Sequence, residues 1–480
     1  MHHPTSGCET RANPSFGTLV QSIWVAVRWI VLSDLHLGAD QSVLTADDGV
    51  SPSATAVAMA DCLRELVGDD RPTLVLAGDA IELALTQMAP AFTVFERFLE
   101  LVHGDEPIIG DRIIYIPGNH DHHLWQVSRQ QGYMRAIQET KPGDDLPAMW
   151  FTSSLDPDQD LPLSPLVALM RRDPRWQGVF VDAVYPNLAL RRPGVERSVI
   201  VHHGHLVESI YSAMSRLGSL VFPTGPPTSV EQIELENNAW IDFLWSELGR
   251  SGAVGTDLHH AYHLLADPAS VRHLTDGVAD RVADRWTKWR IPPALRRWLV
   301  RQVIGDVVAG ARALETQHGG GVLSQDAERG LRAYLDGPLA EQLRLAGIGD
   351  YAFVFGHTHK PFQQLFESGA GKPPTPVYNT GGWVNETATV QRTQGAQAIL
   401  VDDQLSVVAV ELYRQTTNAD AFRVRVREPL VDDAAHHAFH AVVDARVRPL
   451  EHPFIDFSSN VAAELVDQRR ALTDLYAGYR

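Results

Sequence analysis

Cysteine is almost absent from this sequence, because only Cys8 and Cys62 occur among its 480 residues. Two cysteines cannot form the disulfide framework of a small secreted domain. Cys8 also lies in an N-terminal stretch that shows no sustained periodicity. The sequence therefore favours a reducing compartment.

A long apolar run is absent as well. The longest candidate, residues 19–32, is interrupted by Gln21, Ser22 and Arg28. It is too polar for a membrane helix, and it lacks the charged start and the cleavage site of a signal peptide. A cytoplasmic protein is expected by elimination.

The chain has no excess of positive charge. Acidic residues outnumber basic ones by 59 to 41, and the formal net charge is −18. A field of this sign repels long nucleic acid and anionic membranes. It does not exclude a small anionic substrate, because bound metal ions can invert the local potential.

The first half of the chain alternates short apolar runs with segments of helical spacing. The apolar runs cover residues 29–32, 73–76 and 112–116, and the helical segments cover 55–67 and 92–102. Almost continuous apolar runs are typical of strands covered on both faces. The alternation predicts βαβ units and an α/β fold.

The later sequence changes character twice. The pattern from 206 to 345 is almost wholly helical, and strand-like runs return after it. The expected organisation is a tail at 1–27, a core at 28–205 and 346–412, a large helical insert or cap at 206–345, and a C-terminal extension at 413–480.

Five strand-like runs lead directly into a short cluster of Asp, His or Asn. These clusters are Ser33–His36, Gly78–Glu82, Pro117–Asp121, His202–His205 and Gly356–His359. In layered α/β folds, ligands bind beyond the carboxyl ends of the strands, so the clusters are expected to converge. Carboxylate, imidazole and amide donors suit manganese, iron or zinc rather than a thiolate-bound metal.

The ordered set of clusters resembles the calcineurin-like metallophosphoesterase superfamily. One such motif can arise by chance, whereas five in the same order are specific. The resemblance covers residues 28–205 and 346–412. It implies a layered β-sandwich core flanked by helices, with the insert placed before the last motif.

The resemblance also implies two divalent ions, for which Mn²⁺, Fe²⁺ and Zn²⁺ are the candidates. The implied ligands are Asp34, His36, Asp79 and His359 for one ion, and Asp79, Asn119, His203 and His357 for the other. His202 and His205 compete with His203 for the fourth motif. The glycine that follows His203 favours that residue.

The implied chemistry is hydrolysis of a phosphate ester or phosphoanhydride. A hydroxide held between the two ions would attack phosphorus in line. His120 would protonate the leaving oxygen, and Asp121 would orient His120. Glu82 occupies a position where the family often has a carboxylate, and it is expected to support the site.

Several functions share this constellation of residues. The Asn379–Trp383 segment loosely resembles bacterial enzymes that cleave the pyrophosphate of a UDP-sugar, although the insert here is far longer. Phosphodiesterases acting on nucleotides and nucleases use the same ligands, but the acidic balance disfavours a nuclease. A non-catalytic binding module usually lacks some ligands, and none is missing here. The expected substrate is therefore a small phosphorylated or pyrophosphate-containing molecule.

One basic and aromatic segment stands out within the acidic chain. Residues Trp286–Arg301 combine three tryptophans with several arginines. Such a segment can contact a membrane surface or an amphiphilic substrate. The simpler alternative is a helix whose tryptophans pack on the core while its arginines face water. The oligomeric state stays open.

Overall fold

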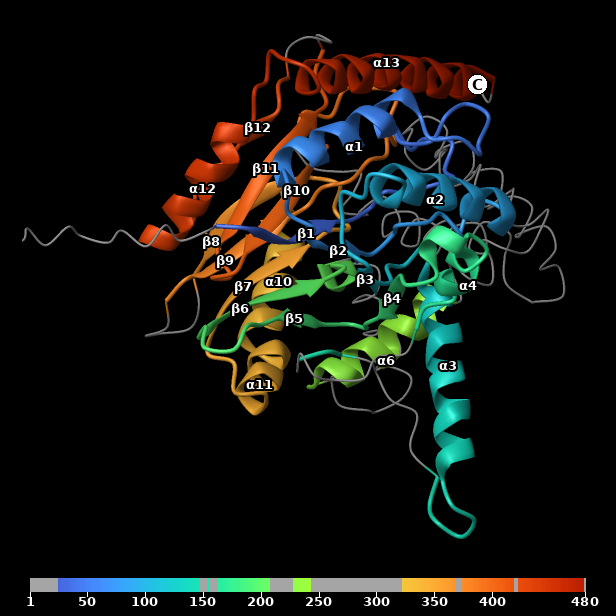
Figure 1. Ribbon diagram of the computed structural model, residues 1–480, viewed down its shortest axis with the longest axis vertical. Helices are drawn as coiled ribbons and strands as arrows, with labels where there is room; N and C mark the ends of the chain where they lie inside the picture. The colour runs from blue at the N-terminus through green and yellow to red at the C-terminus, as the bar shows by residue number, and fades with distance from the viewer. Residues whose placement is uncertain are drawn as a thin grey trace, which may run out of the picture.

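Two β-sheets pack face to face and carry helices on both outer faces (Figure 1). This arrangement is seen in a computed structural model of the chain. The structure describes residues 25–146, 153–155, 163–207, 228–242, 322–367, 373–417 and 422–478. The predicted α/β fold with a layered sandwich core is confirmed.

The first sheet has seven strands in the order β12-β11-β10-β1-β2-β3-β4. Its strands are β1 (Val27–Leu32), β2 (Thr73–Ala77), β3 (Arg112–Ile116), β4 (Phe180–Ala183), β10 (Gly395–Asp402), β11 (Val407–Arg414) and β12 (Arg425–Val426). Strands β1 to β4 pair in parallel, as the βαβ pattern predicts. The other three pair antiparallel, so the sheet is mixed.

The second sheet has five strands in the order β5-β6-β7-β9-β8. Its strands are β5 (Leu188–Leu190), β6 (Arg197–His202), β7 (Asp350–Phe355), β8 (Phe362–Phe366) and β9 (Thr375–Asn379). Strands β6 and β7 are parallel neighbours, although about 150 residues separate them in the chain. The segment between them therefore leaves the sheet after β6 and returns beside it.

Helices cover the outer faces of both sheets. Those around the first sheet are α1 (Ala54–Val67), α2 (Met88–His103), α4 (Leu166–Met170), α12 (Ala434–Arg446) and α13 (Phe454–Gly478). The second sheet is covered by α6 (Val230–Ile241), α10 (Gln325–Asp336) and α11 (Pro338–Leu345). Helix α3 (His122–Glu139) projects away from the layers (Figure 1).

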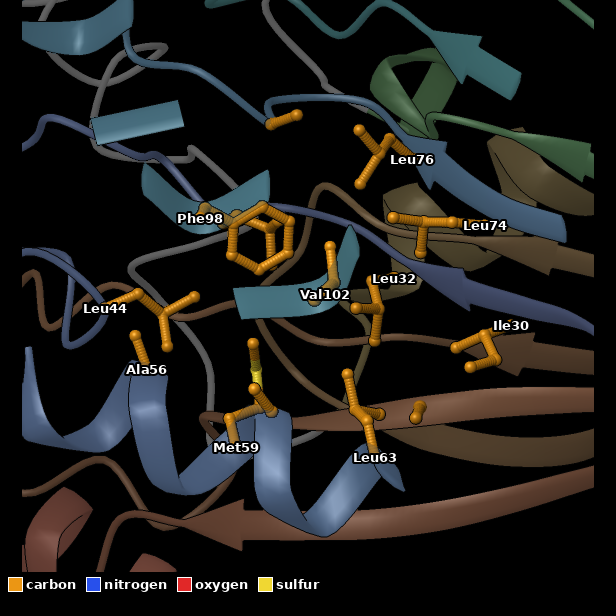
Figure 2. Close-up of a cluster of buried hydrophobic side chains, with 14 of the residues drawn as sticks. Ile30, Leu32, Leu44, Ala56, Met59, Leu63, Leu74, Leu76, Phe98 and Val102 are labelled. Carbon is orange, nitrogen blue, oxygen red and sulfur yellow. The ribbon is translucent and has the colours of Figure 1, made fainter. Parts of the chain in front are cut away.

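The alternation of side chains along the central strands explains their continuously apolar sequences. Ile30 and Leu32 of β1 pack against Met59 and Leu63 of α1 (Figure 2). Val31, between them, faces the other sheet. Because successive side chains point to opposite faces, a strand buried on both sides must be apolar at every position.

The fold leaves some predictions outside the described residues. The described parts of 206–345 are mainly helical, while most of that range, including Trp286–Arg301, is not described. The boundaries of the tail, insert and C-terminal extension stay predictions. Among the described residues, no helix is both long and apolar enough to span a bilayer.

Candidate metal centre

The five polar clusters lie where five central strands end. The first three follow β1, β2 and β3 of the first sheet, and the other two follow β6 and β7 of the second. Strands β1 to β3 are parallel to one another, and so are β6 and β7. Their carboxyl ends therefore deliver polar side chains to one edge of the sandwich.

Asp34, His36 and His359 form the first group of potential ligands. Each offers one atom, and these atoms lie within 4.8 Å of one another. His359 Nε2 is 3.4 Å from Asp34 Oδ1. All three residues are buried. The group therefore joins the first motif to the fifth.

Asp79, His203 and His357 form the second group, again with one atom each within 4.8 Å. His203 Nε2 lies 3.4 Å from Asp79 Oδ2 and 3.2 Å from His357 Nδ1. Asn119 Oδ1 is 3.0 Å from the same His203 nitrogen. The structure thus brings His203 to Asp79, and it places His202 and His205 in a different group.

Asp79 lies between the two groups. Its Oδ2 is 3.7 Å from His36 Nε2 on one side and 3.4 Å from His203 Nε2 on the other. Its Oδ1 accepts a hydrogen bond of 2.7 Å from the backbone N–H of His120. The other six residues predicted as ligands therefore lie in two groups on either side of the Asp79 carboxylate.

The chemistry of these donors fits cations. His203 Nδ1 lies 3.1 Å from Ala77 O, so in the neutral ring Nδ1 carries the proton and Nε2 presents a lone pair. That lone pair faces oxygen atoms of Asp79 and Asn119, which are also acceptors. Likewise, His36 Nδ1 donates to Glu82, and buried His36 Nε2 has no hydrogen-bond partner. Acceptors facing acceptors repel unless positive charge lies between them.

The carboxylates also attract protons to the site. Burial lowers the pKa of His203, but the Asp79 carboxylate overrides this effect and raises the pKa to about 9. Burial similarly opposes protonation of His359, and Glu386 and Asp34 raise its pKa to about 10. The electrostatic preference of the site is thus for positive charge.

Backbone strain is concentrated at the same residues. A positive φ places five candidate ligands in the left-handed region: Asp34 (51°), His36 (44°), Asp79 (48°), His357 (69°) and His359 (54°). Leu405 is the one other non-glycine residue with positive φ in the described part of the chain. Such conformations cost energy and cluster at functional sites.

Glycines let the polar loops approach closely. A Cβ atom on Gly78 would lie 2.0 Å from His203 Nδ1, and one on Gly356 would lie 2.2 Å from Asp34 Oδ2. On Gly382 it would lie 2.4 Å from His359 Cδ2. The ligands are therefore packed against bare backbone.

Gly118→Ala provides a test of this packing. Its Cβ would lie 2.1 Å from Asp79 Oδ1, so the carboxylate must move. We expect the affinity for Mn²⁺ to fall about 10–100-fold, as when partners that orient ligands are lost. Isothermal titration calorimetry measures this change. Gly178→Ala is the matched control, because nothing lies within 4 Å of its added Cβ. Equal Mn²⁺ affinity in Gly118→Ala and the native chain would contradict the packing constraint.

Glu82, rather than Asp121, contacts His120. His120 Nδ1 is 2.8 Å from Glu82 Oε2, and the same oxygen is 2.9 Å from His36 Nδ1. The Asp121 carboxylate instead accepts hydrogen bonds from the backbone N–H groups of Gly118 (2.7 Å) and Ala80 (2.8 Å). The predicted orientation of His120 by Asp121 is therefore corrected. Asp121 ties together the loops that follow β2 and β3.

Glu82 also sets the charge of His120. Burial lowers the pKa of His120, but Glu82 and Asp79 raise it to about 9. Burial opposes ionisation of Glu82, whereas His120 and His36 hold its pKa well below the usual value. The pair therefore favours an imidazolium beside a carboxylate at neutral pH.

One residue of the site was not predicted from the sequence. Glu386 is buried, and its Oε1 lies 3.4 Å from His359 Nδ1. It follows the Asn379–Trp383 segment, which borders the site through a 3.0 Å hydrogen bond from Trp383 N to Asp34 O. Glu386 does not follow a strand end, so the pattern that revealed the other residues carried no signal for it.

A comparison with protein families agrees with this geometry. Residues 27–287, more than half of the chain, match a family model described as calcineurin-like phosphoesterase. The match includes the first four motifs and ends before His357 and His359, which the structure brings to the same site. No curated protein matches the chain.

Proposed function

This chain belongs to the calcineurin-like phosphoesterase family, and on that premise we propose that it hydrolyses a phosphate ester or phosphoanhydride with two divalent metal ions. The observation that carries the proposal is the convergence of five strand ends on Asp79. Asp34, His36 and His359 lie on one side of this carboxylate, and Asn119, His203 and His357 lie on the other. Asp79 would be shared by both ions.

Bound divalent ions would supply Lewis acidity at the phosphoryl oxygens and an acidified water for attack on phosphorus. The protein's part is to hold the ligands rigidly. The positive φ angles and the close glycines leave Asp34 and Asp79 little freedom to turn away. Such preorganisation avoids a reorganisation cost during the reaction.

His120 is the proposed proton donor to the leaving oxygen. Its Nδ1 is held by Glu82, so the donating atom would be Nε2. Although burial opposes protonation, the Glu82 carboxylate raises the pKa of His120, which favours the protonated ring that a general acid requires. Asp121 contributes indirectly, because it fixes the loop on which Asn119 and His120 lie.

The acidic balance of the chain supports a small substrate. A net charge of −18 repels a long polyanion, whereas two dications would offset the charge of a single phosphate or pyrophosphate group. Nucleotides, nucleotide sugars and lipid-linked pyrophosphates are the compounds to screen.

Removal of metal should abolish the activity. After chelation and dialysis, we expect turnover of bis-p-nitrophenyl phosphate to fall to background and to return with added Mn²⁺. Comparison with p-nitrophenyl phosphate separates a diesterase from a monoesterase. Unchanged turnover in the chelated protein would contradict the proposal. Two tightly bound ions without turnover of either compound or of the screened substrates would instead indicate a binding module.

A further inference from the structure

A second buried polar cluster lies beside the candidate metal centre. His202, His205 and Glu234 each offer one atom within 4.8 Å of the others, and all three are fully buried. His202 and His205 bracket His203 at the end of β6, whereas Glu234 comes from α6. The cluster therefore joins a helix of the 206–345 segment to the strand end that carries a candidate ligand.

The Glu234 carboxylate faces polar groups of the core through both of its oxygens. Its Oε2 lies 2.7 Å from His205 Nε2 and accepts a 2.5 Å hydrogen bond from the Tyr185 hydroxyl. Its Oε1 lies 3.5 Å from His202 Nε2. A fully buried carboxylate is costly unless such partners surround it.

The position of the proton on His202 argues against a third metal site. His202 Nδ1 lies 2.7 Å from the backbone N of Gly204 and accepts its N–H. A neutral imidazole carries one proton, so His202 Nε2 is the N–H donor and has no lone pair for a cation. Glu234 Oε1 lies 3.5 Å from His202 Nε2, and neither atom has a hydrogen-bond partner among the described residues, so the contact between them is electrostatic.

The same face of α6 continues the contact. Asn238 lies one helical turn beyond Glu234, and Asp242 directly follows the last residue of α6, so all three lie on one side. Asn238 Oδ1 is 2.7 Å from the Tyr185 hydroxyl, and Asp242 Oδ1 is 2.8 Å from His122 Nδ1. His122 follows the third motif directly. The helix thus contacts the loops that carry two separate ligand motifs.

We propose that Glu234 is a positioning residue that sets the affinity of the ion held by His203. Glu234 contacts the residues on both sides of the His203–Gly204 pair, and Gly204 adopts a positive φ of 119° in a turn packed closely against Phe355, where a side chain would not fit. His203 is also held by the contact of its Nδ1 with Ala77 O and by a 2.7 Å hydrogen bond from the Gly356 N–H to its carbonyl, so loss of Glu234 would weaken its placement rather than release it. The inference rests on the proposed function, since it requires an ion at His203.

Glu234→Gln tests the proposal in the full-length chain. The variant keeps the shape of the side chain but replaces a charged acceptor by an amide. Mn²⁺ titration by calorimetry should show two ions in the native protein. In the variant, one of the two dissociation constants should rise about 10–100-fold while the other is unchanged. Glu231→Gln, on the exposed side of the same helix, is the matched control.

Tyr185→Phe provides an independent variant. It removes one hydrogen-bond donor to Glu234 and keeps the packed ring. We therefore expect the same Mn²⁺ dissociation constant to rise, but by a smaller factor than in Glu234→Gln. If Glu234→Gln does not fold, Tyr185→Phe tests the positioning role of Glu234 in its place. A purely structural role would lower the melting temperature without changing either dissociation constant, and that result would overturn the proposal.

The remaining outcomes separate this inference from the proposed function. Two ions bound with native affinity in both variants would refute the positioning role alone. A third ion that is lost only in Glu234→Gln would also refute it, because the cluster would then be a metal site. A native protein that binds fewer than two ions would refute the proposed function itself.

Discussion

Asp79→Asn should lower turnover about 1,000-fold or more and leave the protein unable to retain two divalent ions. The carboxylate lies between two groups of histidines, with Oδ2 3.7 Å from His36 Nε2 and 3.4 Å from His203 Nε2. Asparagine keeps the shape but removes the charge that both ions would share. It also replaces one oxygen by a donor, which cannot bind a cation.

Two measurements check this expectation. Metal analysis after dialysis gives the number of ions per chain, and kinetics at saturating Mn²⁺ give the turnover. Asp61→Asn is the matched control, because Asp61 is a half-exposed acid whose ion pair with Arg64 lies within one helix. Two retained ions per chain in Asp79→Asn would exclude Asp79 as the shared ligand.

His120→Ala should keep both ions but lower kcat about 100–10,000-fold, the range that general acid–base catalysis contributes. His120 Nδ1 is held by Glu82, and the ring lies beside His36 and Asp79 without being one of the proposed ligands. The loss should therefore appear in kcat rather than in metal content.

The leaving group gives this variant a sharper test. If His120 donates a proton to the leaving oxygen, His120→Ala should lower kcat far more for an alkyl phosphate ester than for a p-nitrophenyl ester. The p-nitrophenolate leaving group needs no proton. His437→Ala serves as control, since this histidine is 54% exposed and pairs with Asp432. Equal losses on both esters would remove the proton-donor role from His120.

The sequence was most informative where local chemistry dictates structure. Strands β1 to β3 were predictable because burial on two faces demands an apolar residue at every position. Strand β5 has only three residues, and β8 has exposed glutamine and leucine side chains, so neither has a clear pattern. Edge strands of this kind are defined by their neighbours in the sheet rather than by their own sequence.

The residues of the site likewise divide into those that the sequence reveals and those that it does not. The proposed ligands were visible because each follows a strand directly. The hydrogen-bond partner of His120 was not predictable in this way. Proximity along the chain favoured Asp121 over Glu82, which is 38 residues away. Glu386 and Glu234 lie outside strand-end motifs altogether, and only the folded structure brings them to the histidines. Long-range contacts between single residues leave no periodic signal.

The division of the ligands between the two sheets has a further consequence. Asp34, Asp79 and Asn119 extend from one sheet, whereas His203 and His357 extend from the other. Ions bound between them would crosslink the two sheets at the edge where the strands end. By mass action, a free ion concentration one hundred times the dissociation constant would stabilise the native state by about 2.7 kcal/mol for each bound ion. Divalent ions should therefore protect the chain against proteases as well as support its chemistry.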